Sequence, residues 1–529
     1  MAMPESAPPA SAWAPLRDAA FRNLWIALLA SNIGTWMQTV GAQWLLVDAP
    51  HAATLVSLVQ TASTLPILLL ALPAGALADS FDKRRMLIAV QLGLVCVGAM
   101  LTALTAADLM PPALLLTLTF ALGAGQALTL PAWQAVIPEL VPRADLPSAS
   151  ALGGISQNLA RAVGPAIAGA LIADTGVAAV FALNTLSFAV FAVVLWRWHH
   201  PADEDAGEPE RFTAAVRAGG RYVRHSPVVQ RVLLRSALFV VPGSALWALL
   251  PLVASRRLGL GAGGYGVLLG AMGVGAVAGA LVLPRLRRTM SINRMIFAAS
   301  VLYTVVLVAL AAAPWELVVL AVLLPAGAAW VTVMSSINAA MQLFLPAWVR
   351  ARGLSIYQIV FAAGLGLGAL LWGALAQATT LEISYVAAAA LMALGAASVP
   401  FAPLRDVSGL NRDPAVYWPV PHLELEPHPL TGPVVVTLTY TVSAEREAQF
   451  IAAMRAVRRS RMRTGAIRWG LFRSGERPGQ FVEMYQVPSW DEHLRQHSDR
   501  LTGTDQAIDE RARSLADGPP QVTHLLPTS

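Results

Sequence analysis

The chain has 529 residues, of which 56% are hydrophobic and only 13% are charged, and its formal net charge is +6 at pH 7. So few charged residues could not cover this much apolar surface in water, which excludes a purely soluble globular protein. The arginines punctuate apolar segments and form no basic stripe with interleaved aromatic residues, so no nucleic-acid partner is expected.

The first 20 residues are rich in Ala, Pro and Ser and lack the apolar core of a signal peptide, so residues 1–20 are predicted to be a cytoplasmic tail. Apolar runs follow, each long enough to cross a hydrocarbon core of about 30 Å, which takes about 20 helical residues. Those of the first half are residues 24–47, 55–77, 86–105, 113–137, 149–173 and 178–198. Those of the second half are residues 232–254, 266–286, 296–313, 317–345, 354–376 and 383–401. The predicted fold class is an all-α polytopic membrane protein with 12 transmembrane helices in two six-helix bundles, residues 21–198 and 229–403.

Lysine and arginine orient these helices, because short cytoplasmic loops retain basic residues. If the N-terminus is cytoplasmic, every second loop is basic, and only Arg256 and Arg257 depart from the pattern. The basic loop residues are Lys83, Arg84, Arg85, Arg143, the arginines between 211 and 231, Arg285, Arg287, Arg288, Arg294, Arg350 and Arg352. We therefore expect both termini on the cytoplasmic side of a bacterial inner membrane.

A polar interval at residues 199–228 separates the two halves and is too charged to lie in the bilayer core. It is predicted to be a cytoplasmic central loop. Its second part, in which Phe212, Val216 and Tyr222 alternate with arginines, fits either an amphipathic helix on the membrane surface or a solvated linker helix.

The second and eighth apolar segments end alike, with a glycine that precedes a basic loop. The first stretch runs from Gly75 through Asp79 to Arg84 and Arg85, and the second from Gly279 to Arg285. Two homologous bundles related by an axis along the membrane normal would produce this repeat, with a substrate site between them near the midplane.

The first stretch resembles the Gly-x-Leu-Ala-Asp-x-x-Gly-Arg-Arg motif of the major facilitator superfamily, with Asp82 at or near the motif glycine. In that superfamily the motif acts as a cytoplasmic gate. The resemblance therefore implies a gating role here, and simple topogenic charge is the alternative. The implied gating residues are Gly75, Asp79, Arg84, Arg85, Gly279 and Arg285.

A second stretch, Gly164-Pro165-Ala166-Ile167-Ala168-Gly169, is similar to the Gly-Pro-x-x-Gly-Gly motif of antiporter-type exporters. Gly164 and Gly169 would allow close helix approach and Pro165 would bend the helix, although generic helix packing explains them as well. Residues 31–38 and 138–146 further resemble the branch that contains enterobactin exporters and transmembrane secretion effectors. This resemblance covers roughly residues 15–402 and implies export of a siderophore, secondary metabolite or drug-like compound by alternating access, with proton coupling.

Arg161 lies deep within the fifth segment, with Gln157 and Asn158 on the same helical face. A central arginine costs about 3 kcal/mol to insert, so it should face the bundle interior or a wet cavity. We predict that it contacts an anionic substrate or a coupling carboxylate; the alternative is a structural ion pair or an arginine that snorkels to the membrane interface. Asn32, Gln38 and Gln126 could line the same path or simply bond neighbouring helices.

From residue 404 the composition becomes that of a soluble protein, with a Pro-rich linker at residues 404–430 and an α+β domain at residues 431–529. Strand and helix patterns at residues 434–442, 450–457, 466–473, 480–487, 489–497 and 521–526 give the order β-α-β-β-α-β. This order is ferredoxin-like and resembles the dimeric α+β barrel of the antibiotic-biosynthesis-monooxygenase type, which implies homodimerisation.

His493 and His497 are four residues apart and could share one helical face as metal or haem ligands. We favour the alternative that they are surface or partner-contacting histidines, because the spacing shows no third ligand. We therefore predict no metal and no cofactor. The main functional hypothesis is a secondary active exporter of a small molecule in the lipid bilayer. The alternative is a membrane-tethered enzyme or effector whose C-terminal domain carries the activity.

Overall fold

The computed structural model describes residues 13–80, 82–142, 145–198, 212–312, 315–404, 410–418, 423–424 and 427–528. The chain divides into two compact units. The first contains residues 1–209, 235–336 and 358–403, and the second contains residues 210–234, 337–357 and 404–529.

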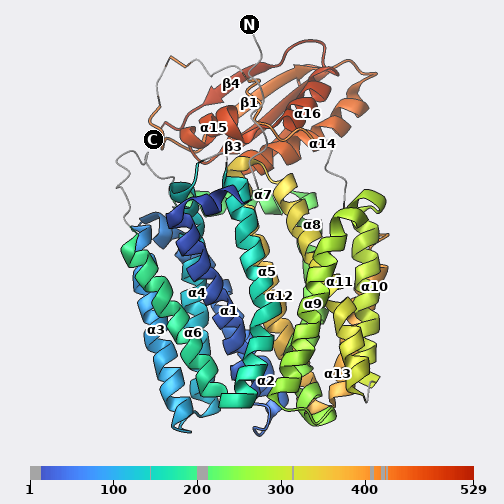
Figure 1. Ribbon diagram of the computed structural model, residues 1–529. Coiled ribbons are helices and arrows are strands. Elements are labelled where there is room, and N and C mark those ends of the chain that lie inside the picture. Colours follow the sequence, from blue (N-terminus) through green and yellow to red (C-terminus); the bar gives the residue numbers. More distant parts are fainter. Residues whose placement is uncertain are drawn as a thin grey trace. The chain divides into compact units, whose positions relative to one another are not determined.

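Long helices form the first half of the first unit (Figure 1). They are α1 (Ala19–Leu45), α2 (Ala52–Ser80), α3 (Lys83–Ala106), α4 (Pro112–Leu140), α5 (Leu146–Thr175) and α6 (Val177–Arg197). Asp18 and Asp82 cap α1 and α3 by accepting bonds from the backbone N–H groups of Phe21 and Arg85. Gly176, with φ of 90°, permits the tight turn between α5 and α6.

The second half repeats this arrangement. Its helices are α8 (Pro227–Leu252), α9 (Ala262–Thr289), α10 (Ile292–Ala312), α11 (Glu316–Phe344), α12 (Ala347–Ala378) and α13 (Leu381–Ala397), and the π-helical turn η3 (Val253–Arg257) extends α8. Arg235 closes the C-terminal end of α13, since its guanidinium donates to the carbonyl oxygens of Gly395 (3.0 Å), Ser398 (2.6 Å) and Ala402 (2.8 Å). A cation is favourable there because the last carbonyl groups of a helix have no partner within the helix.

Nine helices in the described parts of the chain are long and apolar enough to cross a membrane. They are α2, α3, α4, α6, α8, α9, α10, α11 and α12, and all nine overlap predicted spans. The three other predicted spans overlap α1, α5 and α13. Helix α13 has only 17 residues, while α1 and α5 carry polar residues such as Asn32 and Gln157 that lower their hydropathy. The mostly helical, multi-pass fold is confirmed, and the number of twelve spans stays a prediction.

The second unit contains a four-stranded antiparallel sheet in the order β2-β3-β1-β4. Its elements are α7 (Phe212–Arg224), β1 (Val434–Thr441), α14 (Glu447–Thr464), β2 (Arg468–Arg473), β3 (Gln480–Val487), α15 (Trp490–Arg495), the π-helical turn η4 (Gln496–Arg500), α16 (Gly503–Arg513) and β4 (Gln521–Leu525). The order along the chain follows the prediction, except that the second predicted helix, residues 489–497, is divided into α15 and η4, and that α16 is a further helix which the sequence did not indicate. The ferredoxin-like and monooxygenase-type assignment itself stays a prediction.

One face of this sheet carries the core. Residues of β1 alternate between buried and half-buried, and the buried ones, Val434, Val436, Leu438 and Tyr440, share one apolar core with side chains of α14 and α16. Tyr417 and Trp418, which were expected in the linker, also join this core. Trp418 is buried there and donates from Nε1 to Asp509 Oδ2 at 3.0 Å.

Helix α7 also packs within the second unit. Tyr222 is buried against the edge of Trp348 and under the guanidinium of Arg463, and Arg221 donates to Glu492 Oε2 at 3.0 Å. The sequence predicted either a membrane-surface helix or a solvated linker helix here. Neither prediction included packing against residues of the C-terminal domain. The side chains of Phe212 and Val216 and the loop residues 199–211 lie outside the description.

Candidate functional site

Polar side chains of α1, α4 and α5 gather inside the first half. Gln157 Nε2 donates to Asn32 Oδ1 at 3.2 Å, and Asn32 Nδ2 donates to Ser156 Oγ at 3.0 Å. Gln126 of α4 also bonds to α1, by donating to Thr35 Oγ1 at 3.2 Å. Three of the residues predicted to line the substrate path therefore form hydrogen bonds between α1 and either α4 or α5. They are Asn32, Gln126 and Gln157.

Gln38 does not belong to this group. Its Oε1 accepts a hydrogen bond from Asn184 of α6, and both side chains are buried. The bond ties α1 to α6, which is the interhelical role that the sequence left open for Gln38. The side chain of Asn158 lies outside the description.

Arg161 is half-buried, and its guanidinium lies 5.3 Å from the ring centroid of Trp36 on α1. A cation over an indole face contributes about 0.5–2 kcal/mol, more where water is excluded. Trp36 in turn lies 5.6 Å from Trp247 of α8, measured between ring centroids. Arg161 is thus connected through Trp36 to the second half.

Sequence reasoning missed the aromatic cluster that continues from this point. Trp247 lies 5.6 Å from Trp330 of α11, and Trp330 lies 6.4 Å from Phe361 of α12, again between centroids. The indole Nε1 atoms of Trp247 and Trp330 are buried and have no hydrogen-bond partner among the described residues. The tryptophans themselves were the available signal. A buried indole N–H usually needs a hydrogen-bond partner, so a tryptophan inside an apolar span suggests a particular role there.

The two halves are hydrogen-bonded to each other on the side where α1 ends and α2 begins. Gln43, near the end of α1, donates to the carbonyl oxygen of Trp247 at 3.3 Å and accepts from the Tyr265 hydroxyl at 2.8 Å. Thr61 of α2 donates to the carbonyl oxygen of Gly366 in α12 at 2.7 Å. These bonds hold the two halves together at one end of the bundle.

The residues of the implied packing motif lie at close helix contacts. A Cβ atom added to Gly169 would be 2.5 Å from the Cα atom of Gly266 in α9, and one added to Gly164 would be 2.8 Å from Trp36 Cβ. Pro165 lies within α5 at the same contact, since its carbonyl oxygen faces Gly266. Neither glycine leaves room for a side chain.

The implied gating residues are dispersed. Arg84 donates from Nε to Leu195 O (2.9 Å) and from Nη2 to Trp196 O (2.5 Å), so it closes the end of α6. Arg85 and Arg285 are exposed, and a Cβ atom on Gly279 would be 2.6 Å from Ala328 Cα of α11. Gly75 and Asp79 fall in α2, beyond the part of that helix whose side chains are described, so their gating role stays a prediction.

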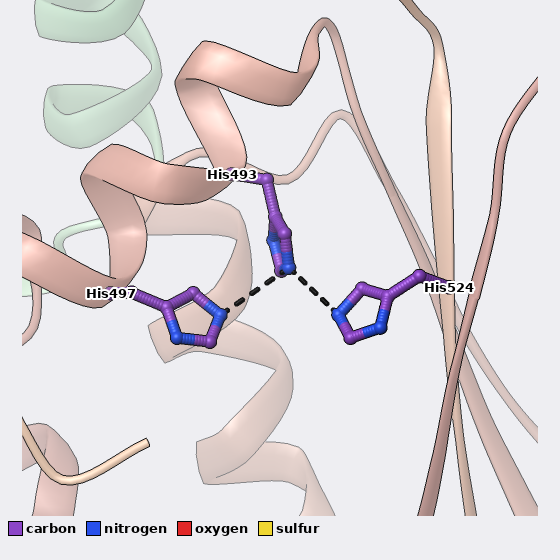
Figure 2. A group of neighbouring side chains, drawn as sticks. All are labelled: His493, His497 and His524. Carbon is purple, nitrogen blue, oxygen red and sulfur yellow. Dashed lines mark hydrogen bonds between the residues drawn. The ribbon is translucent and has the colours of Figure 1, made fainter. Parts of the chain in front are cut away.

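The second unit brings a third histidine to the predicted pair. Figure 2 shows His493 between His497 and His524, and the latter lies on β4 opposite Val436 of β1. The Nε2 atoms of His497 and His524 are 3.3 Å and 3.0 Å from His493 Nε2. Burial lowers the pKa of His493 to about 3, and the two neighbouring histidines act in the same direction.

Glu492 precedes this cluster and forms an ion-pair network. It accepts from Arg500 at 2.6 and 3.0 Å and from Arg221 of α7 at 3.0 Å. Burial alone would raise the pKa of Glu492, but the hydrogen bonds and charges of Arg500 and Arg221 hold it below the ordinary value. The carboxylate is therefore ionised at neutral pH.

A family model described as transmembrane secretion effector, of the major facilitator superfamily, matches residues 10–529. The chain belongs to this family. The match includes the second unit as well as the helices, so the C-terminal domain is part of the family pattern.

The curated relatives of this chain are transporters. The staphyloferrin A transporter of Staphylococcus aureus is 23% identical over 276 residues, which is 52% of this chain and 69% of that protein. The multidrug efflux pump Tap of Mycolicibacterium fortuitum is 27% identical over 409 residues, or 72% of this chain and 95% of the pump. The enterobactin exporter EntS of Shigella boydii is 28% identical over 272 residues, or 50% of this chain and 64% of the exporter.

Solved structures of the same fold include a bacterial homologue of the lysosomal transporter Spinster, described as inward-facing, with a TM-score of 0.57 and 14% identity. The match covers 73% of this chain and 97% of the chain of the Spinster homologue. Together with the family match, these relatives confirm the prediction of a multi-pass membrane transporter and support the export of small molecules. They also favour transport over catalysis, as the sequence predicted.

Proposed function

We propose that this transmembrane secretion effector exports a small molecule across a bacterial inner membrane by alternating access of two six-helix bundles. The observation that carries the proposal is a row of side chains that crosses between the halves, from Arg161 through Trp36 and Trp247 to Trp330. In two-bundle transporters the substrate site lies between the bundles near the midplane. This row is where such a site is expected.

The chemistry of the row suggests a substrate class. It offers one guanidinium, several indole faces and two buried indole N–H donors that have no acceptor among the described residues. A planar or aromatic compound with anionic or other acceptor groups would satisfy all three features. Many siderophores, secondary metabolites and drug-like compounds have this chemistry.

The proposed topology has 12 spans with both termini in the cytoplasm. In this orientation the bonds of Gln43 and Thr61 close the outer side, which corresponds to a cytoplasm-facing conformation. The residues from Gly75 to Arg85 and from Gly279 to Arg285 are proposed to gate the cytoplasmic side. Proton coupling rests on the resemblance to antiporter-type exporters, and Gly164, Pro165 and Gly169 are its motif.

The second unit is proposed to regulate the transporter and to dimerise through its sheet, as the resemblance to a dimeric α+β barrel implies. The sheet face opposite the core carries apolar side chains, and Phe472, Met484 and Leu525 are exposed to 52%, 39% and 51%. A second copy of this sheet would cover them. The rival hypothesis, a membrane-tethered enzyme, has no support from the relatives, which are all transporters.

A deletion strain complemented with single-site variants tests the proposal. Metabolites retained in the cells and missing from the medium identify the exported compound. We expect Arg161→Ala to lower its efflux by at least about tenfold, or about 1.4 kcal/mol, because the cation that attracts the substrate is lost. Arg161→Lys should retain part of the activity, since it keeps the charge.

Arg294→Ala is the matched control, because Arg294 is exposed at the start of α10. Quantitative immunoblotting of membrane fractions ensures that equal amounts of each variant are compared. Normal efflux by Arg161→Ala at equal expression would rule out the proposed role of this arginine. A deletion strain with no compound shifted from medium to cells would count against export altogether.

A further inference from the structure

Three histidines of the second unit point their ring nitrogens at one place (Figure 2). His493 lies on α15, His497 follows one turn later on η4, and His524 comes from β4. One nitrogen atom of each lies within 4.8 Å of the other two, and two of the separations are 3.0 and 3.3 Å. The pairing of β4 with β1 brings His524 to the other two rings, which is why a local spacing rule does not find it.

Hydrogen bonding alone does not account for this arrangement. The Nε2 atom of a neutral imidazole is either one donor or one acceptor. His493 Nε2 faces two other Nε2 atoms at hydrogen-bond distance, so at most one of the two contacts is a hydrogen bond at any moment. A cation at the common centre would satisfy all three lone pairs at once.

The distances suit a tetrahedral metal ion. With Zn–N bonds of about 2.0–2.1 Å, neighbouring ligand atoms of a tetrahedron are about 3.3 Å apart. The two measured separations from His493 Nε2 are close to this value. His497 and His524 are only half-buried, so their rings can rotate to bring the third pair to the same separation.

The surroundings also suit a cation. His493 is fully buried, and the aromatic rings of Trp490 and Trp418 flank the cluster at centroid distances of 5.4 Å from His493 and 4.8 Å from His497. The charge of nearby Arg461 is balanced, since its guanidinium donates to Glu483 and Asp509 at 3.1 Å each.

We propose that His493, His497 and His524 form a binding site for a divalent transition-metal ion, with zinc the expected occupant. Imidazole ligands favour zinc, copper and nickel over magnesium and calcium, which prefer oxygen ligands. Three protein ligands leave a fourth position for water or for a small ligand. The site is independent of the transported compound.

A bound metal ion would lie next to the contact between α15 and α7. Glu492 adjoins the ligand His493 and holds Arg221 of α7 and Arg500 of η4. The ion would fix α15, η4 and β4 to one another, and thereby the carboxylate that α7 binds. The site therefore gives the second unit a means to respond to metal supply.

Metal analysis of the full-length protein tests the site. The protein is purified in detergent without a polyhistidine tag, incubated with Zn²⁺ and desalted, and its metal content is measured by mass spectrometry. We expect about one zinc ion per chain, and Co²⁺ should give the visible absorption of a tetrahedral complex. Mg²⁺ should not compete. Loss of two ligands in His497→Gln/His524→Gln should weaken Zn²⁺ binding by at least about tenfold.

His428→Gln is the control, because His428 belongs to the same unit and lies outside the cluster. The double variant avoids His493, whose burial makes a folding defect the expected result of its replacement. Equal melting temperatures of the metal-free proteins show that the double variant is folded. Absence of stoichiometric zinc in the wild type, or equal zinc in the double variant, would overturn the proposal.

Discussion

Arg461 is a fully buried cation in the second unit, and its neighbours explain how it is kept charged. Burial alone would lower the pKa of Arg461, but Asp509 and Glu483 raise it well above the ordinary value. Glu483 also accepts hydrogen bonds from the Tyr440 hydroxyl (3.0 Å) and from Trp469 Nε1 (2.9 Å). This network joins α14, α16 and three strands of the sheet.

Replacement of Arg461 by Met should destabilise the second unit by about 3–5 kcal/mol, because two buried carboxylates lose their cation. Pulse proteolysis of the purified chain at increasing urea concentrations measures the free energy of opening. Arg459→Met, an exposed position on the same helix, should change it by less than about 0.5 kcal/mol. Equal free energies of opening for the two variants would mean that the buried ion pairs of Arg461 with Glu483 and Asp509 do not stabilise the second unit.

Residue-level roles were the least predictable part of the protein. The sequence pointed to His493 and His497, but the third histidine depends on the pairing of β4 with β1. It also pointed to Arg161, whereas its neighbour Trp36 comes from another helix and follows from tertiary packing. Hydropathy and spacing report local structure, and neither contains these long-range contacts.

At the scale of elements, the contact of α5 with α9 is unusually close. Gly169 faces Gly266, and a Cβ atom on Gly273 would be 2.6 Å from the Cα atom of Ala162. Such backbone approach needs small residues on both helices. It places the packing motif of α5 at the boundary between the two halves.

Gly266→Ala should impair the transporter, because its Cβ atom would lie 2.7 Å from Gly169 Cα and force the helices apart. Overpacking of this kind costs about 1–3 kcal/mol. We expect a lower melting temperature in detergent and reduced efflux. Gly270→Ala is the control on the same helix, because its Cβ atom would lie 3.5 Å from Ala166 Cβ, an ordinary contact. Equal behaviour of the two variants would show that the α5–α9 contact is not tight.

Element boundaries could largely be read from the sequence. The predicted span 113–137 corresponds to α4 (Pro112–Leu140), and the predicted strand 434–442 corresponds to β1 (Val434–Thr441). Apolar runs and alternation act over a few residues, which is why they succeed here. Residues 410–418 were expected in a linker because of their prolines, but Trp418 finds a place in the sheet core, and only the folded sheet creates that place.

At the scale of the whole molecule, the second unit is built from three separate parts of the sequence. Arg500 lies over the ring of Trp348, which precedes the long apolar stretch of α12, and Arg412 lies over Phe344 at the end of α11. Tyr222 of α7 is buried in the same unit. The C-terminal domain therefore covers aromatic residues that belong to other parts of the chain.

Deletion of residues 404–529 should consequently lower the melting temperature of the remaining protein, because Tyr222, Phe344 and Trp348 lose the guanidinium groups of Arg463, Arg412 and Arg500 that lie over their rings. Efflux per molecule should persist, since the row from Arg161 to Trp330 is retained. Efflux is measured in cells and divided by the amount of protein in the membrane. Complete loss of efflux with an unchanged melting temperature would instead place the C-terminal domain in the transport cycle.

The glycine contact of α5 and α9 has a mechanical consequence. Interlocked side chains hold two helices at one crossing angle, because each must leave its groove before the helices can turn. At Gly169 and Gly266 no side chains interdigitate, because backbone lies against backbone. One helix can therefore rotate on the other while the two helices remain in contact. We expect this seam to be the fulcrum of the moving halves. A carrier with such a fulcrum changes the side to which it opens by rolling, with little repacking along the seam.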